Sequence, residues 1–270
     1  GLPATVYGSQ RVKSAQMIAD TPRFYPITPN IRQVDAFNAY SAGCGHAFAT
    51  SAGFPKAWRD RRAFICGPTG NLLGMYDIRP KDSGYEAINA FSFMASADEW
   101  FSPVVAEVGP DGNLWVADWY NFIIQHNPTP NKGRAGYDAK NGQGNAHINP
   151  NRDRQHGRIY RVVHTGRKPQ AAPKMSEQGY EQLIGHLESG NGWRRDTAQR
   201  LLVERNEKAA LPILRETATA SEYHLARQHA LWALEGLAGL DAPTIAQALG
   251  DKHPRVRIAA LRVAESFTAK

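Results

Sequence analysis

The chain has 270 residues, 42% of them hydrophobic, with ten tyrosines and six tryptophans, and this composition excludes an intrinsically disordered protein. The formal net charge is +7, but the basic residues are scattered and form no Lys/Arg block, so nucleic-acid binding is not expected. No apolar run reaches about 18 residues, so we do not expect a membrane-spanning protein.

Residues 1–163 are punctuated by Gly, Pro, Asn and Asp, and their apolar runs are short. This pattern predicts β-strands separated by turns. The expected strands and the two longer irregular loops between them are the following: strands at 63–66, 72–78, 104–108, 114–117 and 158–163, and loops at 80–90 and 128–154.

The segment 108–121, VGPDGNLWVADWYN, has the clearest pattern. Residues 110–112 suit a tight turn, and the alternating residues 114–117 suit a pleated strand. This combination is typical of a β-propeller blade, and propellers carry their chemistry at strand ends around a central channel. The pattern therefore predicts a functional site where this strand ends, at Asp118, Trp119, Tyr120 and Asn121.

After a linker at 164–174, the apolar period changes from two residues to about three and a half, which predicts helices. The expected helices lie at 182–187, 195–203, 210–217, 225–237, 244–249 and 255–266. We therefore predict a mixed protein, β then α, with a β domain at 1–163, the linker, and a helical domain at 175–270.

The predicted helices repeat at about 30 residues, because RDTAQRLL from Arg195, RQHALWAL from Arg227 and RIAALRVA from Arg257 align. The pattern resembles short HEAT repeats, and an ordinary helical bundle is the alternative. The recurring arginines suit either a row of cations that faces an acidic partner or hydrogen bonds to turn carbonyls of the neighbouring repeat.

Three segments together resemble a known family: 38–73, 93–130 and 152–162. They are similar to the C-terminal blades of large exported propeller proteins known as membrane-bound dehydrogenases, found in planctomycete-type bacteria and related to soluble glucose and sorbosone dehydrogenases. Those proteins often continue into HEAT repeats, and GNGWRRDTAQRLLVER from Gly190 looks like the first one. The resemblance implies partial propeller blades followed by a short HEAT-like α-solenoid.

The resemblance also implies a periplasmic or extracellular sugar or polyol dehydrogenase-like protein, although no signal peptide is visible in this chain. If catalytic, it would use pyrroloquinoline quinone and calcium. Only two or three blades fit into residues 1–163, so we expect a fragment or a product of processing, for which another chain would supply the missing blades. No C-x-x-C-H motif for a c-type haem occurs, so a separate cytochrome or other acceptor would take the electrons. The alternative is a noncatalytic module that binds a glycan or a protein.

Two residues carry the catalytic interpretation. His46 follows Gly43 and Gly45, which allow a tight bend, and a histidine near neutrality suits a general base; the alternative is a structural histidine. Asp118 is the second catalytic candidate. With Asn121 it offers oxygen ligands for calcium, but an aspartate after a strand also commonly caps the next turn.

Aromatic and basic residues complete the predicted site. Trp119 and Tyr120 suit a platform that stacks on a sugar ring, or packing between blades. Arg152, His156 and Arg158 suit a clamp for the carboxylates of a quinone or an acidic sugar, or a network that holds the preceding loop.

The two cysteines, Cys44 and Cys66, lie too far apart in the sequence for a metal-ligand pattern. Either they pair across adjacent strands in an oxidising compartment, or they are two free buried thiols.

Overall fold

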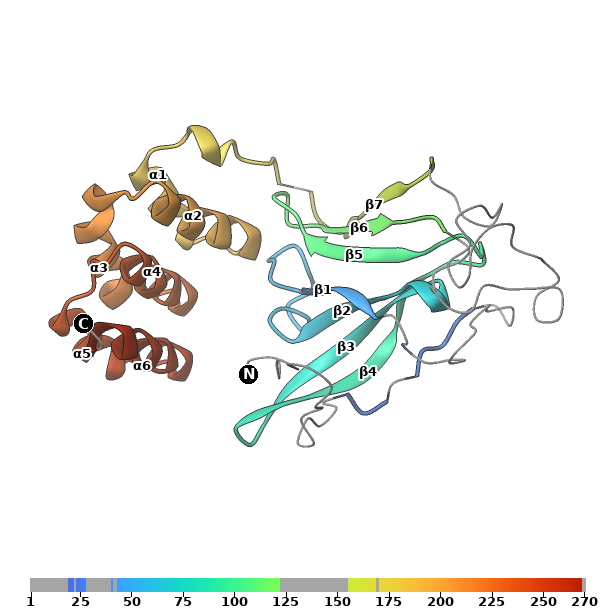
Figure 1. Cartoon of the computed structure of the whole chain (residues 1–270), viewed down its shortest axis with the longest axis horizontal. Coiled ribbons are helices and arrows are strands. Elements are labelled where there is room, and N and C mark those ends of the chain that lie inside the picture. Colours follow the sequence, from blue (N-terminus) through green and yellow to red (C-terminus); the bar gives the residue numbers. More distant parts are fainter. Residues whose placement is uncertain are drawn as a thin grey trace, which may run out of the picture. The chain divides into compact units, whose positions relative to one another are not determined.

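The computed structural model describes residues 19–21, 23–27, 40, 43–121, 155–168 and 170–268. The chain divides into two compact units (Figure 1). The first unit comprises Gly1–Ala49, Phe54–Val108 and Leu114–Val163, and the second comprises Thr50–Gly53, Gly109–Asn113 and His164–Lys270. The protein is therefore mixed, with β-strands first and α-helices after them.

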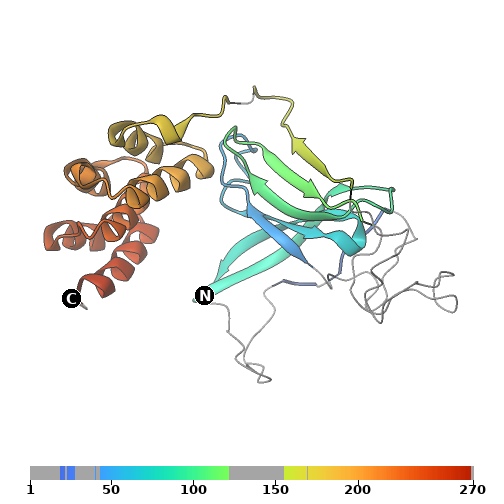
Figure 2. The same ribbon diagram turned by 45° about the horizontal axis from the view of Figure 1, so that its top comes forward.

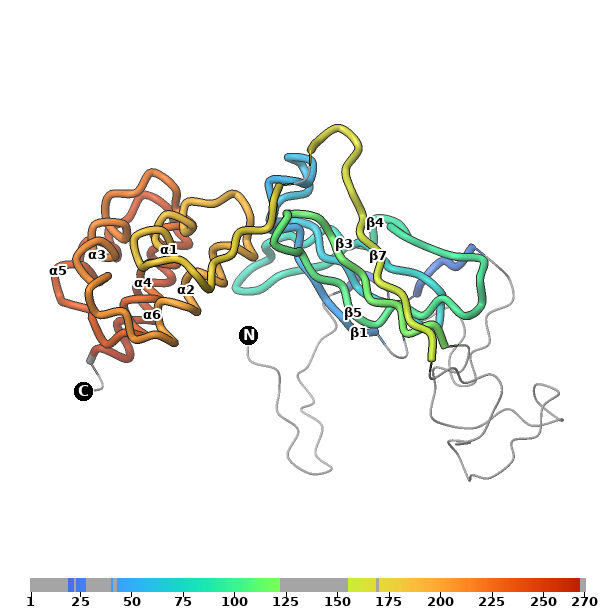
Figure 3. The backbone as a smooth tube through the Cα atoms, turned by 90° about the horizontal axis from the view of Figure 1, so that it is seen from above, coloured from blue at the N-terminus to red at the C-terminus, as the bar shows by residue number. Residues whose placement is uncertain are grey.

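The first unit contains two antiparallel sheets in which each strand pairs with the next along the chain. The four-stranded sheet consists of β1 (Cys44–Phe48), β2 (Arg62–Gly67), β3 (Leu72–Lys81) and β4 (Gly84–Ala95), with a short 3-10 helix, Pro68–Gly70, between β2 and β3. The three-stranded sheet consists of β5 (Pro103–Val108), β6 (Leu114–Asp118) and β7 (Arg158–Val162). Strand β1 packs against β5, so the two sheets meet along their first strands (Figure 3).

The core of this unit lies between the two sheets. Phe64, Leu73 and Met75 of the first sheet pack in one apolar cluster with Leu114 and Val116 of the second, and all five side chains are fully buried. Along β6 these buried residues alternate with partly exposed ones, as a strand with one covered face requires. The alternation predicted from the sequence for 114–117 is thus confirmed.

The other predicted strands are also present. The prediction of an irregular loop at 80–90 is wrong, because two strands occupy most of this segment. Strand β3 continues to Lys81, and β4 begins at Gly84 after a two-residue turn in which Asp82 has a φ of 51°. Strand β4 was not predicted because its side chains alternate weakly between buried and exposed, and β1 was not predicted because it is short and irregular at Gly45. The predicted loop at 128–154 lies outside the described residues.

The second unit contains the six predicted helices, which form three consecutive pairs (Figure 2). The helices are α1 (Tyr180–Leu187), α2 (Gly192–Glu204), α3 (Leu211–Ala220), α4 (His224–Gly236), α5 (Ala242–Leu249) and α6 (Pro254–Thr268). Two 3-10 helices, Met175–Glu177 and Lys208–Ala210, precede α1 and α3. The first helices of the pairs contact one another in one layer, and α2, α4 and α6 contact one another in a second layer.

Small and branched apolar residues share the core of the helical unit. Ala198, Ala230 and Ala260 lie at equivalent positions of α2, α4 and α6 and are fully buried, which allows these helices to approach closely. Leu202 and Leu231 fill the space around them. No helix of the described residues is long and apolar enough to cross a membrane.

The loops 50–53 and 109–113 of the second unit are fixed at the beginning of α2. Asn191 caps that helix by accepting a hydrogen bond from the Trp193 N–H at 3.1 Å. Its amide nitrogen donates to the carbonyl oxygens of Gly109 and Pro110, also at 3.1 Å. Gly112 has a φ of +79°, so the turn predicted at 110–112 is present.

Candidate functional site

Asp118 ends strand β6 and is buried, with 3% of its surface exposed. Its Oδ1 accepts hydrogen bonds from the backbone N–H of Ser102, at 2.8 Å, and of Tyr120, at 2.7 Å. These bonds fix the turn in which Tyr120 has a φ of 53°. Asp118 therefore caps this turn, which was the structural alternative for it.

The second carboxylate oxygen of Asp118 is different. Oδ2 is buried and accepts neither of these two backbone hydrogen bonds. Burial raises the pKa of the neighbouring Tyr160 phenol, and the negative charge of Asp118 and a hydrogen bond to its carboxylate raise that pKa further. A buried carboxylate oxygen that the backbone does not use is a suitable ligand for a hard cation.

The structure places Asn121 close to Asp118 through Ser102. The hydroxyl of Ser102 donates to the Asn121 carbonyl oxygen at 2.6 Å, and the Asn121 N–H donates to that hydroxyl at 3.4 Å. Asn121 and Ser102 are both buried. The two predicted calcium ligands thus belong to one buried polar group at the end of β6.

The aromatic residues of this site lie nearer the surface. The Tyr120 ring lies 5.7 Å from the Trp100 ring, measured between centroids. The guanidinium carbon of Arg158 lies 3.3 Å from the centre of the Tyr120 ring, a cation–π contact. Trp119 is 42% exposed. Arg158 therefore joins the predicted aromatic platform.

The other predicted residues are not brought into this group. His46 is exposed on β1, and no contact joins it to Asp118 among the described residues. A side chain at the neighbouring Gly45, whose φ is +54°, would lie 2.3 Å from the Val104 carbonyl oxygen, so the tight bend predicted beside His46 is present. His156 is exposed just before β7, and Arg152 lies outside the described residues.

The ligands for a metal ion or a quinone are therefore only partly supplied. Within the ranges that the structure describes, no group of three His, Cys, Asp or Glu side chains could hold a metal. Asp118 Oδ2 fits calcium as one oxygen ligand, but calcium takes six to eight. For a quinone carboxylate, Arg158 is the only described arginine of the predicted clamp.

A second polar group, in the turns of the helical unit, is more regular. In each helical pair, the arginine in the first turn of the second helix donates to a carbonyl of the turn before that helix. The three bonds are Arg195 to Ser189 O at 2.6 Å, Arg227 to Ser221 O at 2.6 Å and Arg257 to Asp251 O at 2.7 Å. The sequence suggested, as one interpretation, hydrogen bonds to turn carbonyls of the neighbouring repeat. The arginines do bond to turn carbonyls, but each turn belongs to the same pair as its arginine.

The side chain at the accepting position of each turn repeats as well. Ser189, Ser221 and Asp251 each accept a hydrogen bond from the backbone N–H two residues later, at 3.1, 3.0 and 2.7 Å. Turn and helix are thus fixed by the same two contacts in every pair. The sequence signal was a Ser or Asp six residues before each arginine.

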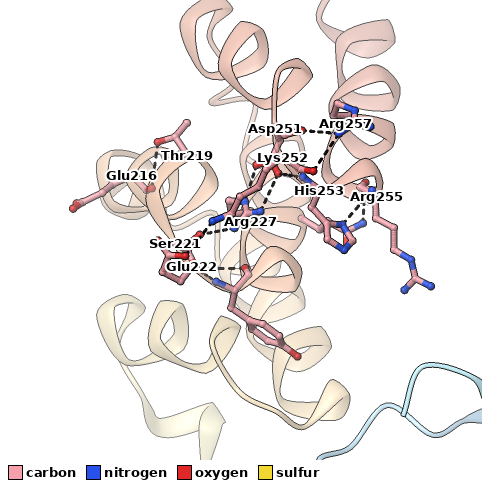
Figure 4. Close-up of polar contacts among 12 residues, drawn as sticks. Glu216, Thr219, Ser221, Glu222, Arg227, Asp251, Lys252, His253, Arg255 and Arg257 are labelled. Atoms are coloured by element: carbon pink, nitrogen blue, oxygen red, sulfur yellow. Dashed lines mark hydrogen bonds and ion pairs between the residues drawn. The ribbon is translucent and has the colours of Figure 1, made fainter. Parts of the chain in front are cut away.

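Arg227 makes one further contact, to the next helical pair (Figure 4). Its Nε and Nη2 donate to the two carboxylate oxygens of Asp251 at 2.7 and 2.9 Å. The two side chains are only 3% and 10% exposed. Burial acts to raise the pKa of Asp251, but the bonds from Arg227 and from the His253 N–H outweigh it and hold that pKa below its usual value.

Arg195 lacks this second contact, because Ser221 occupies the position equivalent to Asp251. Its Nε is buried and has no hydrogen-bond partner in the described part of the chain. We predict that Ser221→Asp raises the free energy of unfolding by about 1–2 kcal/mol by providing a charge-assisted acceptor. Ser221 donates to Glu188 at 2.5 Å, so the change is made together with Glu188→Gln, which prevents two carboxylates from meeting.

Chemical denaturation of this double variant, followed by far-UV circular dichroism, checks the prediction. The reference protein is Glu188→Gln alone, which differs only at Ser221. Equal or lower stability of the double variant would show that Arg195 does not form a hydrogen bond with the new carboxylate.

A small cavity in the second unit is lined by Ser51, Asn113, His164, Arg167 and Asn191, among others. Two of its polar side chains already have structural partners. Asn191 holds the 109–113 loop, and Arg167 donates to the Ala52 carbonyl oxygen. The cavity therefore offers few groups to a ligand.

The comparisons with known proteins place the first part of the chain in a family. The family model described as "Domain of unknown function (DUF7133)" matches residues 3–166, which is more than half of the 270 residues. No curated protein and no solved structure matches the chain. The helical unit lies almost entirely after the matched segment. Because the family model matches more than half of the residues, this chain belongs to the DUF7133 family.

Proposed function

We propose that this chain is a propeller–HEAT module that binds a partner protein through the outer face of α6. The observation that carries the proposal is the exposure on α6 of two large apolar side chains whose equivalents on α2 and α4 are buried or approach the following helical pair. Ile258 and Leu261 are 60% and 58% exposed. Two large apolar side chains one turn apart on a helix form a contact surface of the kind that partner helices cover.

The equivalents of Leu261 show what this position does within the chain. In α4 the equivalent residue is Leu231, which is fully buried in the core. In α2 it is Gln199, whose Oε1 lies 2.7 Å from Nδ1 of His229 in α4. Leu231 is thus covered in the core, and Gln199 contacts the following pair.

The equivalents of Ile258 have the same orientation. Gln228 of α4 donates to the Arg255 carbonyl oxygen of α6 at 3.2 Å. The Asp196 carboxylate of α2 lies 3.8 Å from Nε2 of His229, and the Asp196 side chain itself is 72% exposed. We infer that Ile258 and Leu261 mark the face of α6 that a further helical pair covers.

The charge on this face specifies the partner. Arg227 binds Asp251 of the following pair, and Arg257 is its equivalent in α6. Arg257 is exposed, and its bonds to the Asp251 and Lys252 carbonyls use only one terminal nitrogen, Nη1. The expected partner is therefore a helical hairpin with a carboxylate in its turn.

A second copy of this chain does not fit that description. Its three turns carry Ser189, Ser221 and Asp251 at the relevant position, and the only carboxylate among them is already buried against Arg227. The expected partner is therefore a helical hairpin other than the three described in this chain.

The fold supports a binding module of this type. Two antiparallel meanders that meet along their first strands are what adjacent propeller blades require, and three stacked helical pairs are what a HEAT-like solenoid requires. Together with the resemblance to exported membrane-bound dehydrogenases, this suggests propeller blades and a location in the periplasm or outside the cell. Further propeller blades are a second partner that this module would bind.

A synthetic hairpin tests the proposed surface. The probe has the sequence of residues 239–268, with its two helices cross-linked and its helicity verified, so that it presents Asp251 in the turn. Titrated into the full chain, it should bind, and Arg257→Ala should weaken binding by at least about tenfold, because the probe's carboxylate would lose its partner. Leu261→Ser should also weaken it.

Arg262→Ala is the matched control, since it removes the same charge from the same helix. Arg262 is exposed and forms an ion pair with the neighbouring Glu265 at 3.7 Å, so its loss should leave binding unchanged. Absence of binding by the folded probe, or equal binding by the Arg257→Ala variant, would contradict the proposal.

A second candidate function is supported by Asp118. Its buried Oδ2 suits a cation, and Tyr120, Trp119 and Arg158 lie beside it, as a sugar site would require. We propose as the alternative a sugar or polyol dehydrogenase-like protein that uses calcium and pyrroloquinoline quinone. The quinone would accept the electrons of the substrate, and Asp118 and Asn121 would contribute oxygen ligands for the calcium ion.

Calorimetric titration with calcium separates the two functions. The dehydrogenase candidate requires calcium binding that Asp118→Asn weakens by at least about tenfold, since the substitution removes the charge of the buried ligand but keeps the acceptor of the two backbone bonds. The control is Asp98→Asn, which alters an exposed aspartate of the same unit. Absence of calcium binding would leave the protein-binding module as the better interpretation.

A further inference from the structure

Cys44 and Cys66 lie directly opposite each other on neighbouring strands. They are register partners in the antiparallel pair β1–β2. Side chains at such positions have Cβ atoms about 4.5–5.5 Å apart, close to the roughly 3.5–4.5 Å that a disulfide spans. The sequence left open whether these residues meet, and only the strand register answers that question.

Both side chains are on the same face of the sheet. Cys66 is fully buried in the core of the first unit, and the partly buried Cys44 packs against the same cluster. The Cys66 thiol donates to the Gly45 carbonyl oxygen, with 3.6 Å between sulfur and oxygen. The sulfur of Cys66 is therefore next to the backbone of the residue that follows Cys44.

We propose that Cys44 and Cys66 form an intramolecular disulfide that joins β1 to β2. The structure shows both as free thiols, which is the reduced form. Oxidation forms one S–S bond and removes one hydrogen from each thiol. The oxidant is a disulfide of a thiol–disulfide oxidoreductase or of oxidised glutathione, whose S–S bond breaks as it takes up the two electrons and two protons.

The disulfide would be made during folding. Burial and the neighbouring Cys44 raise the pKa of the Cys66 thiol to about 12, and burial also raises the pKa of Cys44. The thiolate is the species that attacks a disulfide, so these thiols react slowly once they are buried. Bond formation before the core closes would lock β1, the first strand of the four-stranded sheet, onto β2.

The pair is better suited to a disulfide than to a metal. Structural zinc takes four ligands, and no group of three or more His, Cys, Asp or Glu side chains suited to a metal occurs within the described ranges. The proposal is independent of the proposed function, because it concerns strands β1 and β2 of the first unit and not α6.

Refolding of the full chain with and without an oxidant tests the proposal. Reduced, denatured protein is refolded with a mixture of reduced and oxidised glutathione, alkylated in denaturant, and weighed by mass spectrometry. We expect a monomer that carries no alkyl group and whose mass is about 2 Da below that of the unalkylated reduced chain. The midpoint of thermal unfolding should be higher than that of the reduced protein by about 5–10 °C.

Two variants make the test specific. Cys44→Ser leaves the fully buried Cys66 in place and should remove the rise in the midpoint on oxidation. The double variant Cys44→Ser, Cys66→Ala should unfold at the same temperature with and without reductant, which controls for effects of the reductant itself. Two alkylated cysteines after oxidative refolding, or cross-links only between copies of the chain, would overturn the proposal.

Discussion

Asp251→Asn is expected to lower the free energy of unfolding of the helical unit by about 3–5 kcal/mol. The substitution keeps the size of the side chain but removes the charge that compensates Arg227, whose side chain is only 3% exposed. An isolated buried guanidinium cannot neutralise itself by losing a proton, so the folded state carries the full cost. Guanidinium denaturation followed by far-UV circular dichroism measures the change.

An exposed ion pair of similar length provides the control. Arg200 and Glu204 are 2.8 Å apart on α2, and both side chains are more than half exposed. Glu204→Gln should therefore cost less than about 0.5 kcal/mol, because water screens such pairs. If the two substitutions lowered the free energy of unfolding equally, the burial of the Arg227–Asp251 pair would not contribute to stability. The contact of Arg227 with the next helical pair would then not be a main source of the stability of the helical unit.

Acidification from pH 6.5 to about 4 should reduce the stability of the helical unit through His229. Burial, with a smaller effect of the nearby Arg195, lowers the pKa of His229 from its usual 6.5 to about 4. Between these two pKa values His229 is protonated in the unfolded chain but neutral in the folded chain, so the free energy of unfolding falls as the pH falls. At 1.36 kcal/mol per pKa unit the loss reaches about 3 kcal/mol at pH 4.

The variant His229→Gln isolates this contribution. Glutamine does not titrate, so the loss of stability between pH 6.5 and 4 should be about 3 kcal/mol smaller than in the wild type. Replacement of the exposed His46 by glutamine is the control and should leave the pH profile unchanged. A profile of His229→Gln that follows the wild type would show that another group causes the acid sensitivity.

Most of the secondary structure could be predicted from the sequence because it depends on local patterns. The alternation in 114–117 and the period of the helical segments each show which face of a single strand or helix is buried, so they can be recognised without knowing the neighbouring elements. Strand β4 was missed because its own side chains show no clear alternation. It is a strand because it pairs with β3 through ten register pairs. The two-residue turn at Asp82 completes this hairpin.

The candidate site could be predicted only in part. Asp118 and Asn121 share one buried group, as their spacing suggested, but the bonds through Ser102 come from a residue that no motif marked. His46 has no contact with that group among the described residues, although the sequence paired both as catalytic candidates. Proximity across strands depends on sheet pairing, which single-sequence patterns do not specify.

The sequence by itself determined the mixed composition of the protein, the order of strands and helices, and the repetition of an arginine in each helical pair. Only the tertiary structure decided what those arginines do. Arg227 meets Asp251 because the helical pairs stack, and Cys44 meets Cys66 because β1 and β2 pair in one register. Local patterns follow from the geometry of one element, whereas contacts such as these depend on how separate elements pack.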